Sequence, residues 1–173
     1  MLFYAFWTLV LSTLPVIRAC TPSFKDGIQF QLVDENRKAI TTDGKANSPP
    51  LKLQIAGGTF APEGGFILVN TNRGANSATL LQLSNDEKSV SFQTLPNGPV
   101  RDKKQAWFIS CDSCSEDPAG TKSGCLFNSM QNTRLCLQTA GTGSTPNAFT
   151  VVNCRDDSAG VAKQPQRYSI TTN

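Results

Sequence analysis

The chain has 173 residues, with 16 lysine and arginine residues against 13 aspartate and glutamate residues, so its formal net charge is +3. The charges are scattered singly and the densest basic group is Arg101, Lys103 and Lys104, which excludes the clustered basic face of a nucleic-acid-binding protein. Histidine is absent, which excludes Ser-His-Asp and Cys-His nucleophile systems and imidazole zinc sites. A carboxylate pair for glycoside hydrolysis remains open, but the acidic residues lie mostly in polar turn segments. We therefore expect a non-enzymatic protein with no cofactor and no metal.

Residues 1–19 predict a secretory signal peptide. Residues 1–14 form an uncharged apolar run that is too short to span a bilayer comfortably, and Pro15 precedes the small residue Ala19, after which we place the cleavage. Residues 17–20 (IRAC) loosely resemble a lipobox, but Arg18 and the uncharged start of the chain argue against one. No second apolar stretch reaches membrane length. We expect the mature protein to be secreted to the extracellular space, with no membrane partner.

The segments after the signal peptide predict an all-β domain, because short alternating runs are separated by turn residues and almost no helical periodicity is present. The segment 20–27 precedes the first run. The alternating runs lie at residues 28–32, 51–55, 66–68, 81–83, 90–92, 135–137 and 149–151. The turn segments between them include residues 34–36, 43–44, 97–98 and 156–157.

A weak internal repeat organises these strands. Residues 28–44 align with residues 125–141 at a constant offset of 97, which places Phe30 over Phe127. A middle copy lies at an offset of 41 from the first. None of the three units could bury its apolar face alone, so together they predict a β-trefoil of three four-stranded repeats in a domain over residues 28–173. The repeats span about residues 28–66, 67–107 and 125–170.

An insertion at residues 108–124 separates the second repeat from the third and is rich in cysteine. Six cysteines behind a signal peptide predict three disulfides in an oxidising compartment. The spacing of Cys111 and Cys114 is that of a redox motif or half a zinc knuckle, but no βαβ pattern surrounds it, so we expect structural disulfides. The cysteines are Cys20, Cys111, Cys114, Cys125, Cys136 and Cys154.

The second and third repeats contain four short motifs, at residues 105–107 (QAW), 136–137 (CL), 151–154 (VVNC) and 166–168 (QRY). With these motifs the chain resembles the ricin-B-type lectin family. The resemblance implies a disulfide between Cys136 and Cys154 and a core aromatic at the end of each repeat. With that pair made, we expect Cys20 to bond with Cys111, Cys114 or Cys125 and the remaining two to pair. The loop between Cys111 and Cys114 is too short for a favoured disulfide, so Cys125 should bond to one of them.

The same resemblance implies a sugar site, but this sequence places Gln138 where the family has an acidic residue and Val152 where it has an aromatic platform. We therefore expect a secreted, monomeric binding protein, of the kind of fungal-type trefoil effectors that act in virulence. Its partner would be an extracellular or host protein that it engages through its loops, above all residues 112–124. A glycan-binding lectin and a protease inhibitor are the alternatives. The candidate binding residues are Asp43, Asn47, Asp112, Asp117, Gln138 and Asn153.

Overall fold

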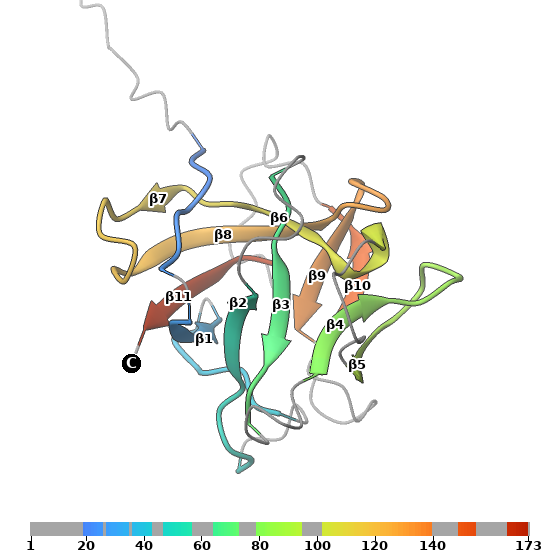
Figure 1. Cartoon of the computed structure of the whole chain (residues 1–173), viewed down its shortest axis with the longest axis horizontal. Coiled ribbons are helices and arrows are strands. Elements are labelled where there is room, and N and C mark those ends of the chain that lie inside the picture. The colour runs from blue at the N-terminus through green and yellow to red at the C-terminus, as the bar shows by residue number, and fades with distance from the viewer. Residues whose placement is uncertain are drawn as a thin grey trace, which may run out of the picture.

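The computed structural model describes part of the chain (Figure 1). This part contains eleven antiparallel strands and a short 3-10 helix, η3 (Lys103–Gln105). That part covers residues 19–25, 27–34, 36–42, 47–56, 64–72, 79–94, 102–139, 149–154 and 166–172. The predicted signal peptide therefore lies, apart from Ala19, outside the described residues. The strands are β1 (Gln29–Val33), β2 (Lys52–Ala56), β3 (Ile67–Asn70), β4 (Thr79–Leu83), β5 (Val90–Thr94), β6 (Trp107–Ser110), β7 (Ser113–Cys114), β8 (Lys122–Ser129), β9 (Leu135–Thr139), β10 (Phe149–Asn153) and β11 (Tyr168–Thr172).

The strands follow the apolar alternation of the sequence, because successive side chains of a strand point to opposite faces. In β1, Phe30 and Leu32 are buried while their neighbours are exposed or half-buried. In β2, Leu53 and Ile55 show the same pattern. Sharp turns join some of these strands. In the turn after β1, the carboxylate of Asp34 accepts the backbone N–H of Lys38 at 2.8 Å.

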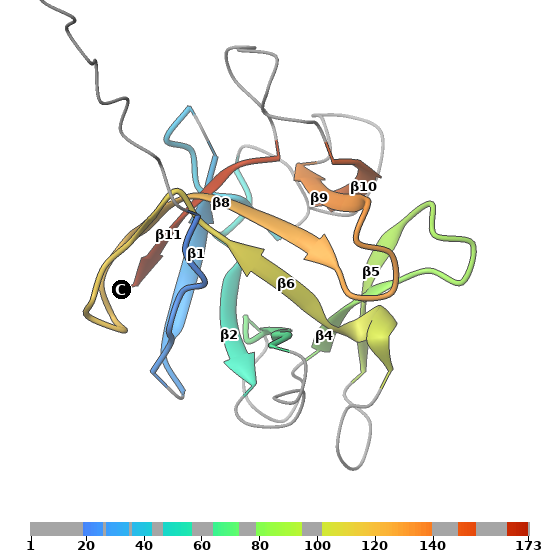
Figure 2. The same cartoon turned by 90° about the horizontal axis from the view of Figure 1, so that it is seen from above.

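All eleven strands belong to one antiparallel sheet, and the prediction of a closed trefoil is therefore wrong. The hydrogen-bonded order is β10-β9-β8-β11-β1-β2-β3-β4-β5, and β6 and β7 pair additionally with β8. The end strands β5 and β10 approach each other, but no pairing between them occurs among the described residues. Figure 2 shows β8 between β6 and β11.

The sequence repeat predicted the wrong fold for a physical reason. It reflects the spacing of buried side chains along each strand, and this spacing does not determine which strands pair. Phe30 and Phe127, which the repeat superposes, are both fully buried. Strand β8 nevertheless pairs with four strands, β6, β7, β9 and β11, whereas β1 pairs with β2 and β11. Strands from different copies of the repeat are thus hydrogen-bonded to one another, and equal side-chain spacing does not imply equal neighbours.

Two apolar clusters lie on opposite faces of β3. Leu68 belongs to the main core, which is centred on the large buried rings of Trp107, Phe127 and Tyr168. Ile67 and Val69 point the other way, into a smaller cluster that Leu80, Ala106 and Met130 complete. The first three residues of β3 are therefore buried although they alternate between two faces, which explains the apolar run from Ile67 to Val69. Among the described residues, no helix is long and apolar enough to cross a membrane.

Tyr168 makes the fold sensitive to alkali. Its buried hydroxyl donates to the carbonyl oxygen of Leu137 at 3.5 Å and accepts from the hydroxyl of Thr139 at 3.4 Å. Burial raises the pKa of Tyr168 above its ordinary value of 10.0, because the ionised form would lose its hydration.

We expect the unfolded chain to ionise at Tyr168 near pH 10.0 while the folded chain stays protonated. The stability contribution of Tyr168 is then complete below that pH and is lost as the pH rises above it. Urea titrations across this range check the expectation. The only other tyrosine, Tyr4, lies in the predicted signal peptide, so the phenolate absorbance of the mature protein reports Tyr168 and should appear only on unfolding. A Tyr168→Phe variant that shows the same alkaline loss would contradict it.

Candidate functional site

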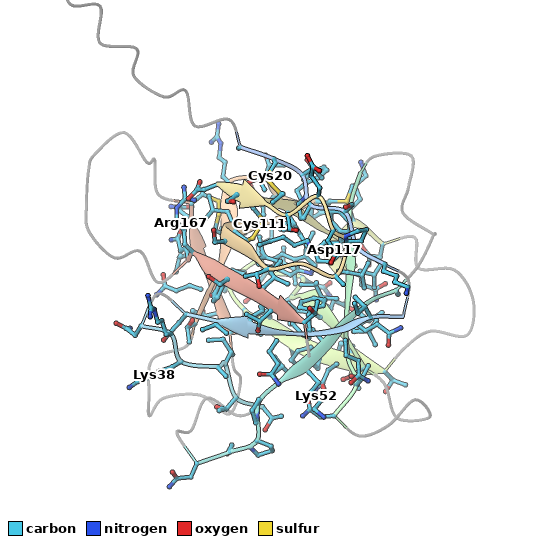
Figure 3. All side chains as sticks on the ribbon, turned by 90° about the vertical axis from the view of Figure 1, so that its left-hand side faces the viewer. Cys20, Lys38, Lys52, Cys111, Asp117 and Arg167 are labelled. Atoms are coloured by element: carbon cyan, nitrogen blue, oxygen red, sulfur yellow. A yellow bond between two sulfur atoms is a disulfide. The ribbon has the colours of Figure 1, made fainter. Side chains whose placement is uncertain are left out.

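Residues 111–125, here called the pinned loop, are fastened at both ends by disulfides. A bond between Cys111 and Cys125 closes the loop on itself, and a bond between Cys20 and Cys114 ties it to the N-terminal segment; both S–S distances are 2.09 Å. Cys20 and Cys111 also exchange two backbone hydrogen bonds of 2.8 Å each. Figure 3 shows these two residues side by side, with Arg167 and Asp117 on the same side of the molecule. The third disulfide joins Cys136 of β9 to Cys154, which follows β10.

Lys122 braces the pinned loop from inside. Although it is a lysine, the residue is 0 % exposed. Its Nζ donates to the backbone carbonyls of Gly120 at 2.6 Å, Pro118 at 3.1 Å and Asp117 at 3.4 Å, and it lies 5.4 Å from the centre of the Phe24 ring. Burial lowers the pKa of Lys122, and the negative charge of Asp117 partly offsets this. The amine is therefore occupied by its own loop.

Arg167 closes the other end of the pinned loop. Its Nη1 lies 2.8 Å from both carboxylate oxygens of Asp112 and donates to the carbonyl of Gly124 at 2.7 Å. The Asp112 side chain is 48 % exposed, yet its charge is paired. Gly124 has a φ of +63°, and a Cβ there would lie 2.1 Å from an oxygen of Asp112, so glycine is required for this close approach.

The predicted binding residues do not form one site. Asp117 is a turn former, because its carboxylate accepts the N–H of Ala119 at 2.9 Å. Gln138 pairs with Thr150 across β9 and β10, and Asn153 lies three residues further along β10, so the two side chains point to opposite faces of the sheet. Asn47 is exposed in a separate turn. Asp43 lies outside the described residues.

Three turns form a second polar region, here called the polar corner, which Figures 1 and 2 both show on the side of the molecule away from β1 and β11. Side-chain hydrogen bonds join the turns. Asn132 Nδ2 donates to Glu87 Oε2 at 2.7 Å, and Lys104 Nζ donates to Asn85 Oδ1 at 3.1 Å. The turns are residues 84–89, 102–105 and 130–134.

The carboxylates of the polar corner are used to hold its turns. Asp86 accepts the hydroxyl of Ser84 at 2.6 Å and the N–H of Lys88 at 3.2 Å. The Ser84 hydrogen bond and then the Lys88 N–H lower the pKa of Asp86, with a smaller contribution from the lysine charge. Asp102 accepts the N–H of Lys104 at 2.9 Å and caps η3. Each of these acidic side chains therefore faces a donor of its own loop.

The polar corner also carries four basic side chains. Lys88, Lys103 and Arg134 are exposed, and Lys104 is half-buried. In the sequence, Lys103 and Lys104 stood out only as part of an ordinary charged surface. Arg134 lies about 30 residues further along the chain, so the sequence did not group it with them. The hairpin turn between β8 and β9 carries Arg134, and the hydrogen bond from Asn132 to Glu87 joins this turn to the turn of Lys88. In the described ranges, no group of three or more histidine, cysteine or acidic side chains could hold a metal ion.

No family model and no curated protein matches this sequence. Solved toxin structures share its fold. The crystal structure of the lysenin pore matches with a TM-score of 0.55 and 15% identity over 90% of this chain and 48% of that chain. The complex of lysenin with phosphocholine matches with a TM-score of 0.55 and 13% identity over 88% of this chain and 47% of that chain. A mosquitocidal holotoxin matches with a TM-score of 0.51 and 14% identity over 87% of this chain and 18% of that chain.

This chain is therefore similar in fold to part of a toxin and spans about half the length of the lysenin chains it matches. The resemblance to ricin-B-type lectins is overturned, because the structural matches are to lysenin and the holotoxin and no family model fits. The expectation of an effector-like protein that binds other proteins through loops, with a lectin or protease inhibitor as alternatives, is overturned by the same matches. The motif residues Cys136, Trp107 and Tyr168 are buried, so they report core packing, not a sugar site.

Proposed function

We propose that this chain is a secreted, non-enzymatic, toxin-like protein that binds membranes through the phosphocholine headgroup of lipids. The observation that carries the proposal is the shared fold, over 88% of this chain, with lysenin in its complex with phosphocholine. Because the chain spans about half of lysenin, the proposal concerns binding to the lipid surface, without assembly of a pore. The three disulfides support secretion, since such bonds persist in oxidising compartments. This proposed lipid partner differs from the expectation from the sequence that the mature protein has no membrane partner.

The polar corner supports the phosphate half of this recognition. A phosphocholine headgroup carries a phosphate, which basic side chains bind by charge-assisted hydrogen bonds. Lys88 and Arg134 are exposed there, while Asp86 and Glu87 accept hydrogen bonds from neighbouring residues of the corner. We therefore assign the phosphate contact to Lys88 and Arg134.

Vesicle sedimentation tests the headgroup. The mature protein should pellet with vesicles of phosphatidylcholine or sphingomyelin, both of which carry phosphocholine, and should not pellet with phosphatidylethanolamine vesicles of matched chain length. Free phosphocholine should compete. Equal binding to all vesicles, or to anionic vesicles alone, would contradict the proposal.

The same assay tests the corner with a Lys88→Ala/Arg134→Ala variant. An exposed contact between a basic side chain and a phosphate contributes up to about 1 kcal/mol, so the double variant should bind up to about 30-fold more weakly. A Lys38→Ala/Lys52→Ala variant is the matched control, because it removes the same charge from exposed positions on the turn after β1 and on β2, outside the three turns of the polar corner. Equal losses in the two variants would show only a net-charge effect and would remove the site assignment.

A further inference from the structure

The N-terminal segment at residues 19–25 is held to the sheet by few interactions. Cys20 forms an isolated bridge with Cys111, and residues 21–25 form no strand. The chain then turns through a hydrogen bond from the N–H of Ile28 to the carbonyl of Lys25 at 3.2 Å. A segment with so few backbone hydrogen bonds belongs to the part of a protein that opens first. The disulfide between Cys20 and Cys114 is its covalent attachment to the sheet.

This segment covers an aromatic patch. The ring of Phe24 stacks on Phe30 at 5.7 Å between centroids and meets Phe66 edge-on at 5.3 Å. Phe30 is 0 % exposed, and Phe66 is half-buried. Pro22, which precedes Phe24 in the same segment, is also buried. If the segment moved away, Phe30 and Phe66 would lose the Phe24 ring that packs on them, and Lys122 would lose its aromatic neighbour.

The bond between Cys20 and Cys114 is also the most accessible of the three. Both of its cysteines are half-buried. Cys111 and Cys125, in contrast, are 1 % and 0 % exposed. In the third bond, Cys136 is 0 % exposed and only Cys154 is half-buried. A reductant must bring its thiolate onto a sulfur atom, and the Cys20–Cys114 bond is the one in which both cysteines are open to such an attack.

We propose that the Cys20–Cys114 disulfide is a reduction-sensitive latch over this aromatic patch. The thiolate of a dithiol reductant attacks one sulfur to form a mixed disulfide, and the other sulfur leaves as a thiolate. The second thiol of the reductant then displaces the first protein sulfur. Two electrons and two protons thus end on Cys20 and Cys114, and the reductant leaves as its cyclic disulfide. Residues 19–25 detach, and Phe30 and Phe66 form an exposed apolar face. The latch is independent of the lipid proposal.

Hydrogen exchange of the folded, mature protein tests the latch. Mild treatment with a dithiol, followed by alkylation and peptide mapping, should label Cys20 and Cys114 before the other four cysteines. Amide exchange at Cys111, whose N–H donates to the carbonyl of Cys20 at 2.8 Å, should then accelerate by about tenfold or more, and binding of a dye that reports apolar surface should rise. Labelling of Cys136 and Cys154 first, or unchanged exchange at Cys111 after labelling of Cys20, would overturn the proposal.

A Cys20→Ser/Cys114→Ser variant should reproduce the open state without reductant. A Cys136→Ser/Cys154→Ser variant, which removes another disulfide with a half-buried cysteine, is the matched control and should leave exchange at Cys111 slow. If the first variant does not fold, the time course of reduction in the wild-type protein decides the question alone. Vesicle sedimentation of the oxidised protein, measured in parallel, tests the lipid proposal separately, because that proposal can fail while the latch opens.

Discussion

Replacing Trp107 by alanine is expected to lower the free energy of unfolding by about 3–5 kcal/mol. Trp107 is 0 % exposed in the main core, and its indole N–H donates to the carbonyl of Leu81 at 3.2 Å. Its backbone N–H and carbonyl also bond to Phe66 at 2.9 and 2.8 Å. The side chain thus fills part of the main core and is anchored to β4 through the carbonyl of Leu81, and its loss leaves a cavity in a close-packed interior.

Urea titration followed by circular dichroism measures the loss. The matched control is Trp107→Phe, which keeps an aromatic ring but removes the indole donor. It should cost less than the alanine variant, because a smaller cavity is left, and part of its cost should come from the carbonyl of Leu81, which loses its indole donor. A Trp107→Ala protein within about 1 kcal/mol of wild type would show that the core collapses around the site, contrary to this description.

Replacing Lys122 by alanine should be the second most damaging change, at about 2–4 kcal/mol. The three carbonyls of Asp117, Pro118 and Gly120 would lose their donor, and the aliphatic stem would no longer fill the space beneath the pinned loop. Lys122→Met keeps most of the stem, so it should recover part of the loss. Equal stability of wild type and both variants would mean that the loop is held by its disulfides alone.

The pH dependence separates the charge of Lys122 from its packing. Since burial lowers the pKa of the folded lysine below 10.5, the unfolded chain binds more protons between the two values, and this side chain makes stability rise with pH in that window. The Lys122→Met variant has no amine at this position and therefore lacks this contribution to the pH dependence of stability. The stability difference between wild type and Lys122→Met should therefore shift in favour of wild type as the pH rises toward 10.5. A difference that is constant with pH would contradict a buried, charged amine.

Only part of the candidate site could be predicted from the sequence. The cysteine count and the insertion at residues 108–124 pointed to a pinned segment, and the structure has a loop there closed by Cys111 and Cys125. The roles of its polar residues could not be predicted, because they depend on partners from distant strands. Asp112 pairs with Arg167, which lies 55 residues away. The polar corner could not be predicted from the sequence for the same reason, because its three turns are far apart in the chain and Arg134 belongs to the turn between β8 and β9.

The sequence by itself determined the strand rhythm and the inward residues, because alternation of apolar side chains is a local property of an extended chain. Phe30 and Phe127 were recognisable as core residues on this basis, and both are buried. Tyr168 is buried too, but it was expected in the core only as the aromatic at the end of a repeat. The tertiary structure alone decided which strands pair, because hydrogen bonds between backbones carry no side-chain signature. Strand β8 pairs with four others, and no period in the sequence encodes these pairings. The tertiary structure also decided that Lys122 is buried, because its amine needs the three carbonyls of its loop and the ring of Phe24 as neighbours.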